Sequence, residues 1–174
     1  MKLRYLLLPI SAVLLIPAAT LPASADATDA SIELTGGALS ITAPADAGSL
    51  GSRANTVEGG TVSGALGQVQ VNDARSAVAG SGWVATGIST AFTPPAGPAI
   101  AASAVSYAAG TITKVGTATY TANNPGNLTA VVPVVTATGI TGDNSATWNP
   151  TITVAVPGGM AAGVYSATIT ESVS

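Results

Sequence analysis

Two tryptophans are the first residues of this sequence whose chemistry could define a function. Trp83 and Trp148 stand in a chain that otherwise has four tyrosines and one phenylalanine. A flat indole ring can stack on the face of a sugar at a binding surface, or it can pack in a hydrophobic core. The alternating apolar residues around both rings favour the core, most clearly for Trp148, which is in phase with Ile152 and Val154.

Three charged residues form the second group of candidates. Asp73 and Glu171 both continue the apolar positions of an alternating segment, so each belongs to an inward face. An acid on such a face needs a partner, because an unpaired buried charge is costly. We expect Arg75 to form an ion pair with Asp73 or Glu171 and to stack on Trp83. The alternative is that both acids lie at strand ends in water.

Catalysis is not expected, because the residue types that it most often uses are missing. The chain has neither His nor Cys, which excludes the commonest general base, thiol nucleophiles and the usual zinc ligands. Lys114 has no Ser-x-x-Lys motif beside it, and no two of the acids are marked as a pair for glycoside cleavage. The sequence therefore predicts no catalytic residue, no metal site and no cofactor.

The first residues have the pattern of a secretory signal peptide. Lys2 and Arg4 precede an apolar run too short to span a bilayer, and the small residues Ala23-Ser24-Ala25 follow it. We expect residues 1–25 to be removed after Ala25 and residues 26–30 to form a short N-terminal extension. The expected location is outside the cell, at the cell wall or cell surface.

The charge of the mature chain limits its partners. Three of the five cations and all eight acids follow the signal, which leaves a net charge of −5. An acidic chain without a basic run argues against nucleic acid and anionic membranes as partners. No later segment is long and apolar enough to span a membrane, and without Cys the fold depends on its hydrophobic core.

The elements that must position these residues are strands. Apolar residues alternate with a period of two, and Gly, Pro and Asn interrupt them. This pattern predicts an all-β fold, a single antiparallel β-sandwich or barrel-like domain of about 9–11 strands over residues 31–174. Gly36-Gly37 predicts a tight hairpin, and we expect the last two strands to pair. The expected strands cover 31–35, 38–43, 61–73, 83–89, 105–107, 111–121, 128–138, 148–156 and 164–173, with a turn at 139–144.

The segments around the two tryptophans also carry a family resemblance. The run Val69-x-Val71-x-Asp73-x-Arg75 before Gly82-Trp83 looks like the first half of the WxL domain of Gram-positive surface proteins. Thr147-Trp148, followed by Pro157 and Gly163-Val164-Tyr165, looks like its second half. The leucine that names the family is absent after both tryptophans, so the chain resembles a divergent, actinobacterial-like variant.

The resemblance implies a secreted, non-catalytic module that attaches non-covalently to the cell wall. Its implied ligand is peptidoglycan or another wall polymer, and Trp83, Trp148, Asp73 and Arg75 become candidate ligand-binding residues. Other envelope proteins, including WxL-interacting partners, are implied as further partners. The alternative function is a structural or adhesive subunit of a surface assembly that acts through protein–protein contacts at exposed β-edges.

Overall fold

The computed structural model describes residues 29–174, so the expected signal peptide lies outside the described residues. One compact unit spans Leu34–Ser174, and residues 29–33 belong to a separate unit. Within residues 29–174 the structure has no helix with the length and hydrophobicity that crossing a membrane requires.

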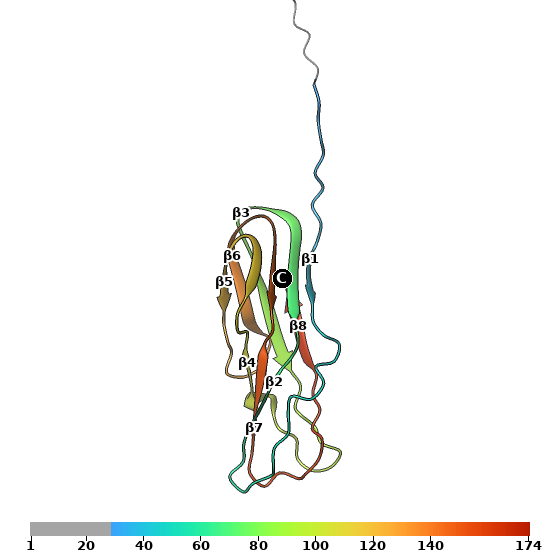
Figure 1. Cartoon of the computed structure of the whole chain (residues 1–174), viewed down its shortest axis with the longest axis vertical. Coiled ribbons are helices and arrows are strands. Elements are labelled where there is room, and N and C mark those ends of the chain that lie inside the picture. Colours follow the sequence, from blue (N-terminus) through green and yellow to red (C-terminus); the bar gives the residue numbers. More distant parts are fainter. Residues whose placement is uncertain (1–28) are drawn as a thin grey trace, which may run out of the picture. The chain divides into compact units, whose positions relative to one another are not determined.

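Two antiparallel sheets form this unit (Figure 1). Sheet A has the order β1 (Leu39–Thr42), β3 (Val69–Ser89), β6 (Val132–Trp148), β5 (Thr113–Ala122), and β8 (Ile169–Val173) also pairs with β3. Sheet B has the order β2 (Gly60–Ala65), β7 (Thr151–Val156), β4 (Val105–Ala108), and a short 3₁₀ turn, η1 (Ala102–Ala104), precedes β4. The predicted all-β, sandwich-like fold is confirmed, with eight strands in the described residues instead of 9–11.

The predicted hairpin around Gly36-Gly37 is wrong. Only Leu39–Thr42 forms a strand there, and it pairs with β3 instead of with residues 31–35. The two glycines allow a close approach of backbones and do not form a turn. A Cβ on Gly36 would lie 2.9 Å from the carbonyl oxygen of Arg75, and the amide of Gly37 donates to the carbonyl of Ala74.

The predicted pairing of the last two strands is also wrong. The segment 148–156 is broken at Asn149-Pro150, where the chain passes from the end of β6 in sheet A to the start of β7 in sheet B. Proline has no amide hydrogen for a strand ladder, which is why the sheet cannot continue through this point. β8 pairs with β3 instead, with Gly87 opposite Glu171.

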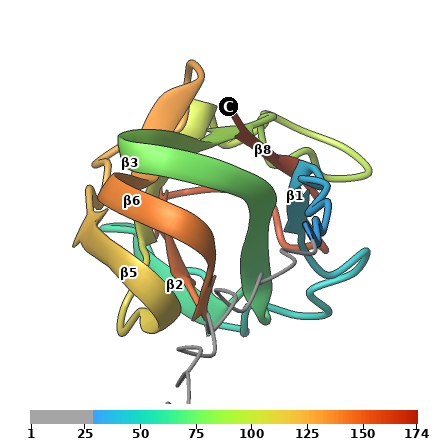
Figure 2. The same cartoon turned by 90° about the horizontal axis from the view of Figure 1, so that it is seen from above.

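A sharp bend replaces the turn that the sequence predicts at 139–144. β3 and β6 run through this region as long paired strands with several register shifts, and Figure 2 shows them curving side by side. Gly139 and Gly142 on β6 adopt positive φ values, as do Ser76 and Gly80 on β3. Such β-bulges let a strand bend without leaving its sheet, so β3 is one strand from Val69 to Ser89.

Candidate functional site

The structure places both indole rings in the core. Trp83 on β3 and Trp148 at the end of β6 each expose 2% of their surface. Neither ring face is therefore open to a ligand. Each indole N–H instead donates to a buried polar group, as buried tryptophans generally require, and the two groups belong to separate hydrogen-bond networks.

The first network lies at the bend of β3, and we call Asp73, Arg75, Trp83, Tyr120 and Asn144 the corner network. The Arg75 guanidinium donates from Nε to Asp73 Oδ1 at 2.8 Å and from Nη2 to Oδ2 at 3.0 Å. Nη2 also donates to the carbonyl of Gly82 at 3.2 Å, so Arg75 connects the two sides of the bulged segment. The bond to Arg75 lowers the pKa of Asp73 and raises the pKa of Arg75.

Asn144 joins this ion pair to Trp83. Its Nδ2 donates to Asp73 Oδ2 at 3.1 Å, while its Oδ1 accepts from Trp83 Nε1 at 3.0 Å and from the Tyr120 hydroxyl at 3.1 Å. Burial raises the pKa of Tyr120, so this hydroxyl keeps the proton that it donates. In the described residues the cation–aromatic contact is Lys114 over Tyr120, with Nζ 5.9 Å from the ring centre, and not Arg75 on Trp83.

The second network joins the two sheets, and we call Trp148, Tyr107 and Glu171 the cross-sheet network. Trp148 Nε1 on sheet A donates to the Tyr107 hydroxyl on sheet B at 2.7 Å. That hydroxyl donates to Glu171 Oε1 on β8, again at 2.7 Å. The second oxygen of Glu171, Oε2, is buried and has no hydrogen-bond partner among residues 29–174. Burial raises the pKa of Glu171 despite the Tyr107 bond, which acts in the opposite direction.

Glu171 therefore does not join the expected ion pair. Arg75 lies two residues from Asp73 on the same strand, whereas Glu171 lies opposite Gly87, near the far end of β3. The pair that forms is Arg75 with Asp73 alone, with the Asp73 side chain fully buried.

Sequence reasoning missed the three residues that hold these networks together. Asn144 falls in a Gly-, Asp- and Asn-containing stretch that resembles a turn, so its inward direction is not evident. Tyr107 and Tyr120 lie on expected strands, and the signal that could have identified them is the scarcity of aromatic residues. A buried tyrosine carries a hydroxyl that needs a partner, as does the indole of each tryptophan.

The outer face of sheet A has a different chemistry from its inner face. Thr42, Gln70, Thr147 and Thr113 form one row across four strands, and the alternation of each strand turns them away from the core. The face is uncharged, and hydroxyl and amide groups dominate it, although the exposed Val115 also lies on it, opposite Ser145. We call it the hydroxyl face and define it by Ser40, Thr42, Gln70, Asn72, Thr86, Thr113, Thr119, Thr121, Thr136, Thr138, Ser145, Thr147 and Ser172.

A cleft of about 850 Å³ lies between the loop 44–59 and the chain 160–169. Its apolar lining comes from both segments, from sheet B and from the bridge of Phe92 with Ile100, and it ranges from buried side chains to the exposed Val164. Arg53 lines it as well, and that guanidinium donates to the carbonyl of Gly59 and the hydroxyl of Thr56. The apolar side chains that line it include Leu50, Val62, Leu66, Phe92, Ile100, Val154, Val156, Met160, Val164 and Ile169.

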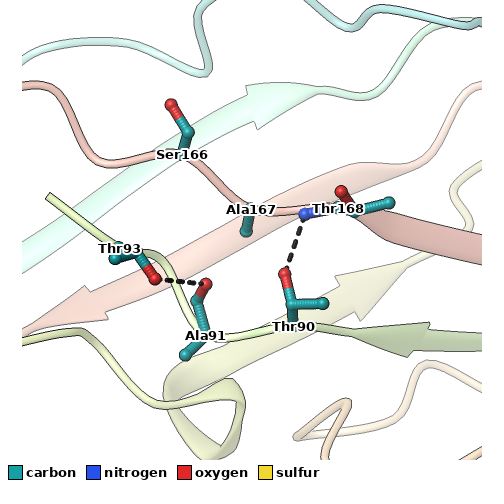
Figure 3. Close-up of a pocket in the computed structure, with 6 residues that line it drawn as sticks. All are labelled: Thr90, Ala91, Thr93, Ser166, Ala167 and Thr168. Atoms are coloured by element: carbon teal, nitrogen blue, oxygen red, sulfur yellow. Dashed lines mark hydrogen bonds between the residues drawn. The ribbon is translucent and has the colours of Figure 1, made fainter.

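A smaller hollow of about 290 Å³ lies where the chain before β8 meets the chain after β3 (Figure 3). Thr93 and Ser166 form a backbone bridge there, and the Thr168 amide donates to the Thr90 hydroxyl at 2.9 Å. The remaining lining is alanine, so the hydroxyl groups of this hollow have no acidic or basic side chain beside them in its lining. Within residues 29–174 no three His, Cys, Asp or Glu residues gather as metal ligands would.

Comparison with known proteins adds no assignment to this geometry. The chain matches no protein-family model, no curated protein and no solved structure.

Proposed function

We propose that this chain is a secreted, non-catalytic module of the Gram-positive cell surface that attaches non-covalently to the cell wall. The proposed ligand is peptidoglycan or another wall polymer, and the proposed contact surface is the hydroxyl face. The observation that carries the proposal is the uncharged row of Thr42, Gln70, Thr147 and Thr113 across the four strands of sheet A.

The spacing of a sheet suits a polymer with repeating hydroxyl and amide groups. Neighbouring strands lie about 4.8 Å apart, and alternate residues of one strand lie roughly 6.5 Å apart. Threonine is restricted at χ1, so its hydroxyl loses little freedom on binding. Each hydrogen bond contributes only about 0.5–1.5 kcal/mol, and many of them along one polymer chain give firm attachment.

The buried tryptophans support the same surface from below. Trp83 and Trp148 lie on the inner side of sheet A, where the corner and cross-sheet networks hold β3, β6 and β8 in place. In this proposal the residues Asp73 and Arg75 position the sheet and do not touch the ligand.

Retention on isolated cell walls tests the proposal. We expect the mature protein to be retained and to resist high salt, because the hydroxyl face has no charge for salt to screen. Replacing Thr113 and Thr121 with Ala removes two exposed hydroxyls of β5 and should weaken retention about tenfold.

The matched control replaces Thr61 and Thr151 with Ala on the outer face of sheet B, where both are exposed. This variant should bind walls as the unchanged protein does. Equal retention of both variants, or release of the unchanged protein by salt, would contradict the proposal.

A subunit of a surface protein assembly is the second candidate function. It is favoured by Ile32 and Leu34, two large apolar side chains that are almost fully exposed. Co-purification of another envelope protein, such as a WxL-interacting partner, in place of wall retention would support this candidate over the first.

A further inference from the structure

The last five residues of β5 read the same in both directions. Ala118-Thr119-Tyr120-Thr121-Ala122 is symmetric about its central tyrosine. The two threonines are exposed on the hydroxyl face, and the other three side chains are half-buried against the core. A two-fold axis places residues equally far from it opposite one another, so two antiparallel copies of this segment would match at every position.

The outer edge of β5 carries a row of unpaired backbone groups. β5 is the last strand on its side of sheet A (Figure 2), and within residues 29–174 it pairs with β6 alone. The amide of Asn123 donates to the carbonyl of Val134 on β6, and backbone groups alternate between the two edges of a strand. The amides and carbonyls of Ala118, Tyr120 and Ala122 therefore point away from β6, as a template for another strand.

This part of the edge lacks the features by which proteins protect open strands. Charged side chains, prolines and bulges are the common protections. In β5 they lie in the first half, where Lys114 is found and Gly116 adopts a positive φ at a shift of register. The segment 118–122 has no charge, no proline and no glycine. β5 also has ten residues, whereas β1, β2, β4 and β8 have four to six, so it is the longest outer strand of the described residues.

We propose that two copies of this chain pair through β5, antiparallel and with a two-fold axis at Tyr120. Thr119 of one copy then lies opposite Thr121 of the other, and Ala118 lies opposite Ala122. Three residues on each strand exchange backbone hydrogen bonds, which gives about six across the contact. Facing threonines are a favourable cross-strand pair, and no like charges meet. Because both copies use the same surface, the contact is closed and gives a dimer.

The core beneath β5 needs no rearrangement for this pairing. The Tyr120 ring packs on Trp83, with the ring centres 5.7 Å apart, and its hydroxyl donates to Asn144. Each of the two tyrosines that meet at the axis is therefore held by its own unit. On the outer side sheet A of one copy continues into sheet A of the other, and so does the hydroxyl face. The pairing itself does not depend on the proposed attachment to the cell wall.

Sedimentation of the mature chain from about 1 µM to about 1 mM tests the proposal. A contact through one strand edge is small, so we expect a dimer to form toward the upper end of this range. Replacing both Thr119 and Thr121 with Lys places like charges opposite each other and should weaken dimerisation about tenfold. Both side chains are exposed and lie beside threonines of β6, so Tm should stay unchanged. The matched control, Thr61→Lys/Thr151→Lys on the outer face of sheet B, should dimerise as the unchanged chain does.

Charge reversal and engineered cysteines test the register. The chain with Thr119→Glu/Thr121→Glu should also dimerise weakly, and its mixture with the Lys variant should form the mixed dimer. Thr119 and Thr121 would face each other as a non-hydrogen-bonded pair, whose Cα atoms lie about 4.5 Å apart, within the range of a disulfide. The chain has no Cys of its own. Oxidation should therefore link Thr119→Cys to Thr121→Cys in a mixture, and it should link neither variant to itself.

Three results would overturn the proposal. The first is an unchanged chain that stays monomeric throughout the concentration range. The second is a dimer that the Lys substitutions at Thr119 and Thr121 leave intact, which would place the contact elsewhere. The third is cross-linking of each cysteine variant with itself as readily as with the other.

Discussion

The corner network and the cross-sheet network both satisfy a buried indole N–H, but they differ in how the charge of their acid is compensated. Each gives a buried indole N–H an acceptor and each includes an acid. In the corner network Asp73 has Arg75 beside it and accepts from Asn144, so its charge is compensated. In the cross-sheet network the Glu171 carboxylate accepts from the Tyr107 hydroxyl and has no other partner within residues 29–174. Asp73 therefore stabilises the fold as an anion, whereas Glu171 does so when it is protonated.

The largest expected effect comes from removing the compensated acid. Asp73→Ala leaves Arg75 Nε and the Asn144 amide without their acceptor, and Arg75 Nη2 keeps only the carbonyl of Gly82. We expect a loss of about 3 kcal/mol in the free energy of unfolding, near the lower end for a broken buried pair because Arg75 is partly exposed. Thermal unfolding should show a decrease in Tm of roughly 10 °C.

The matched control for this variant is Asp143→Ala at the same bend. Asp143 is exposed and accepts from the amide and hydroxyl of Ser76, so its loss should cost only about 1 kcal/mol. If the two alanine variants unfolded at the same temperature, the ion pair at the corner would not be a main support of the bend.

The two tyrosines give the next comparison. Tyr107→Phe removes the hydroxyl partner of Glu171 together with the acceptor of Trp148, which should cost about 1–3 kcal/mol at neutral pH. Tyr120→Phe removes one of two donors to Asn144 Oδ1, which keeps Trp83, and should cost about 0.5–1 kcal/mol. Denaturant unfolding measures the free energy of unfolding of both variants. A larger loss for Tyr120→Phe than for Tyr107→Phe would mean that the corner network depends more on its tyrosine hydroxyl than the cross-sheet network does.

One substitution is expected to stabilise the fold. Glu171→Gln removes the uncompensated charge but keeps an oxygen that can accept from Tyr107. We expect Tm at neutral pH to rise by a few degrees, as about 1 kcal/mol would produce in a domain of this size. A lower Tm at neutral pH would mean that the ionised carboxylate stabilises the fold.

The pH dependence of stability should separate the two acids. Since the folded-state pKa of Glu171 is raised above 4.5, its contribution is fully present below pH 4.5 and is lost as pH rises through that pKa. Since the folded-state pKa of Asp73 is lowered below 3.8, its contribution is present above pH 3.8 and is lost on acidification. Tm against pH should therefore flatten above pH 4.5 for Glu171→Gln and on the acid side for Asp73→Ala.

The strand content was predictable because period-two alternation is a local property. The same alternation predicted wrong strand boundaries where contacts between distant segments determine the structure. The chain passes from sheet A to sheet B at Asn149-Pro150, and the alternation of apolar residues continues through this point. The sequence therefore predicts one strand over 148–156, where β6 ends and β7 begins. At the bend, positive-φ glycines mark bulges within paired strands, and their composition is that of a turn.

The candidate site was predictable only in part, for a physical reason. Asp73 and Arg75 are two residues apart on one strand, so their pairing follows from local geometry. Asn144 and Tyr107 reach Trp83 and Trp148 from strands far away in the sequence, and no local pattern reports such contacts. The Thr-x-Thr spacing of the hydroxyl face is present in the sequence of single strands. Which of these residues lie side by side in a row depends on the register of four strands, and no local pattern gives that register.

Iodide quenching of tryptophan fluorescence tests most directly whether Trp83 and Trp148 are core residues, because it measures the solvent exposure of the two indole rings. The single-tryptophan variants Trp83→Phe and Trp148→Phe assign the signal to each ring. We predict that iodide leaves both emissions nearly unchanged in the folded mature protein and quenches them strongly after unfolding in denaturant. Strong quenching of either ring in the folded protein would contradict the burial of that tryptophan and make it a candidate ligand-binding residue.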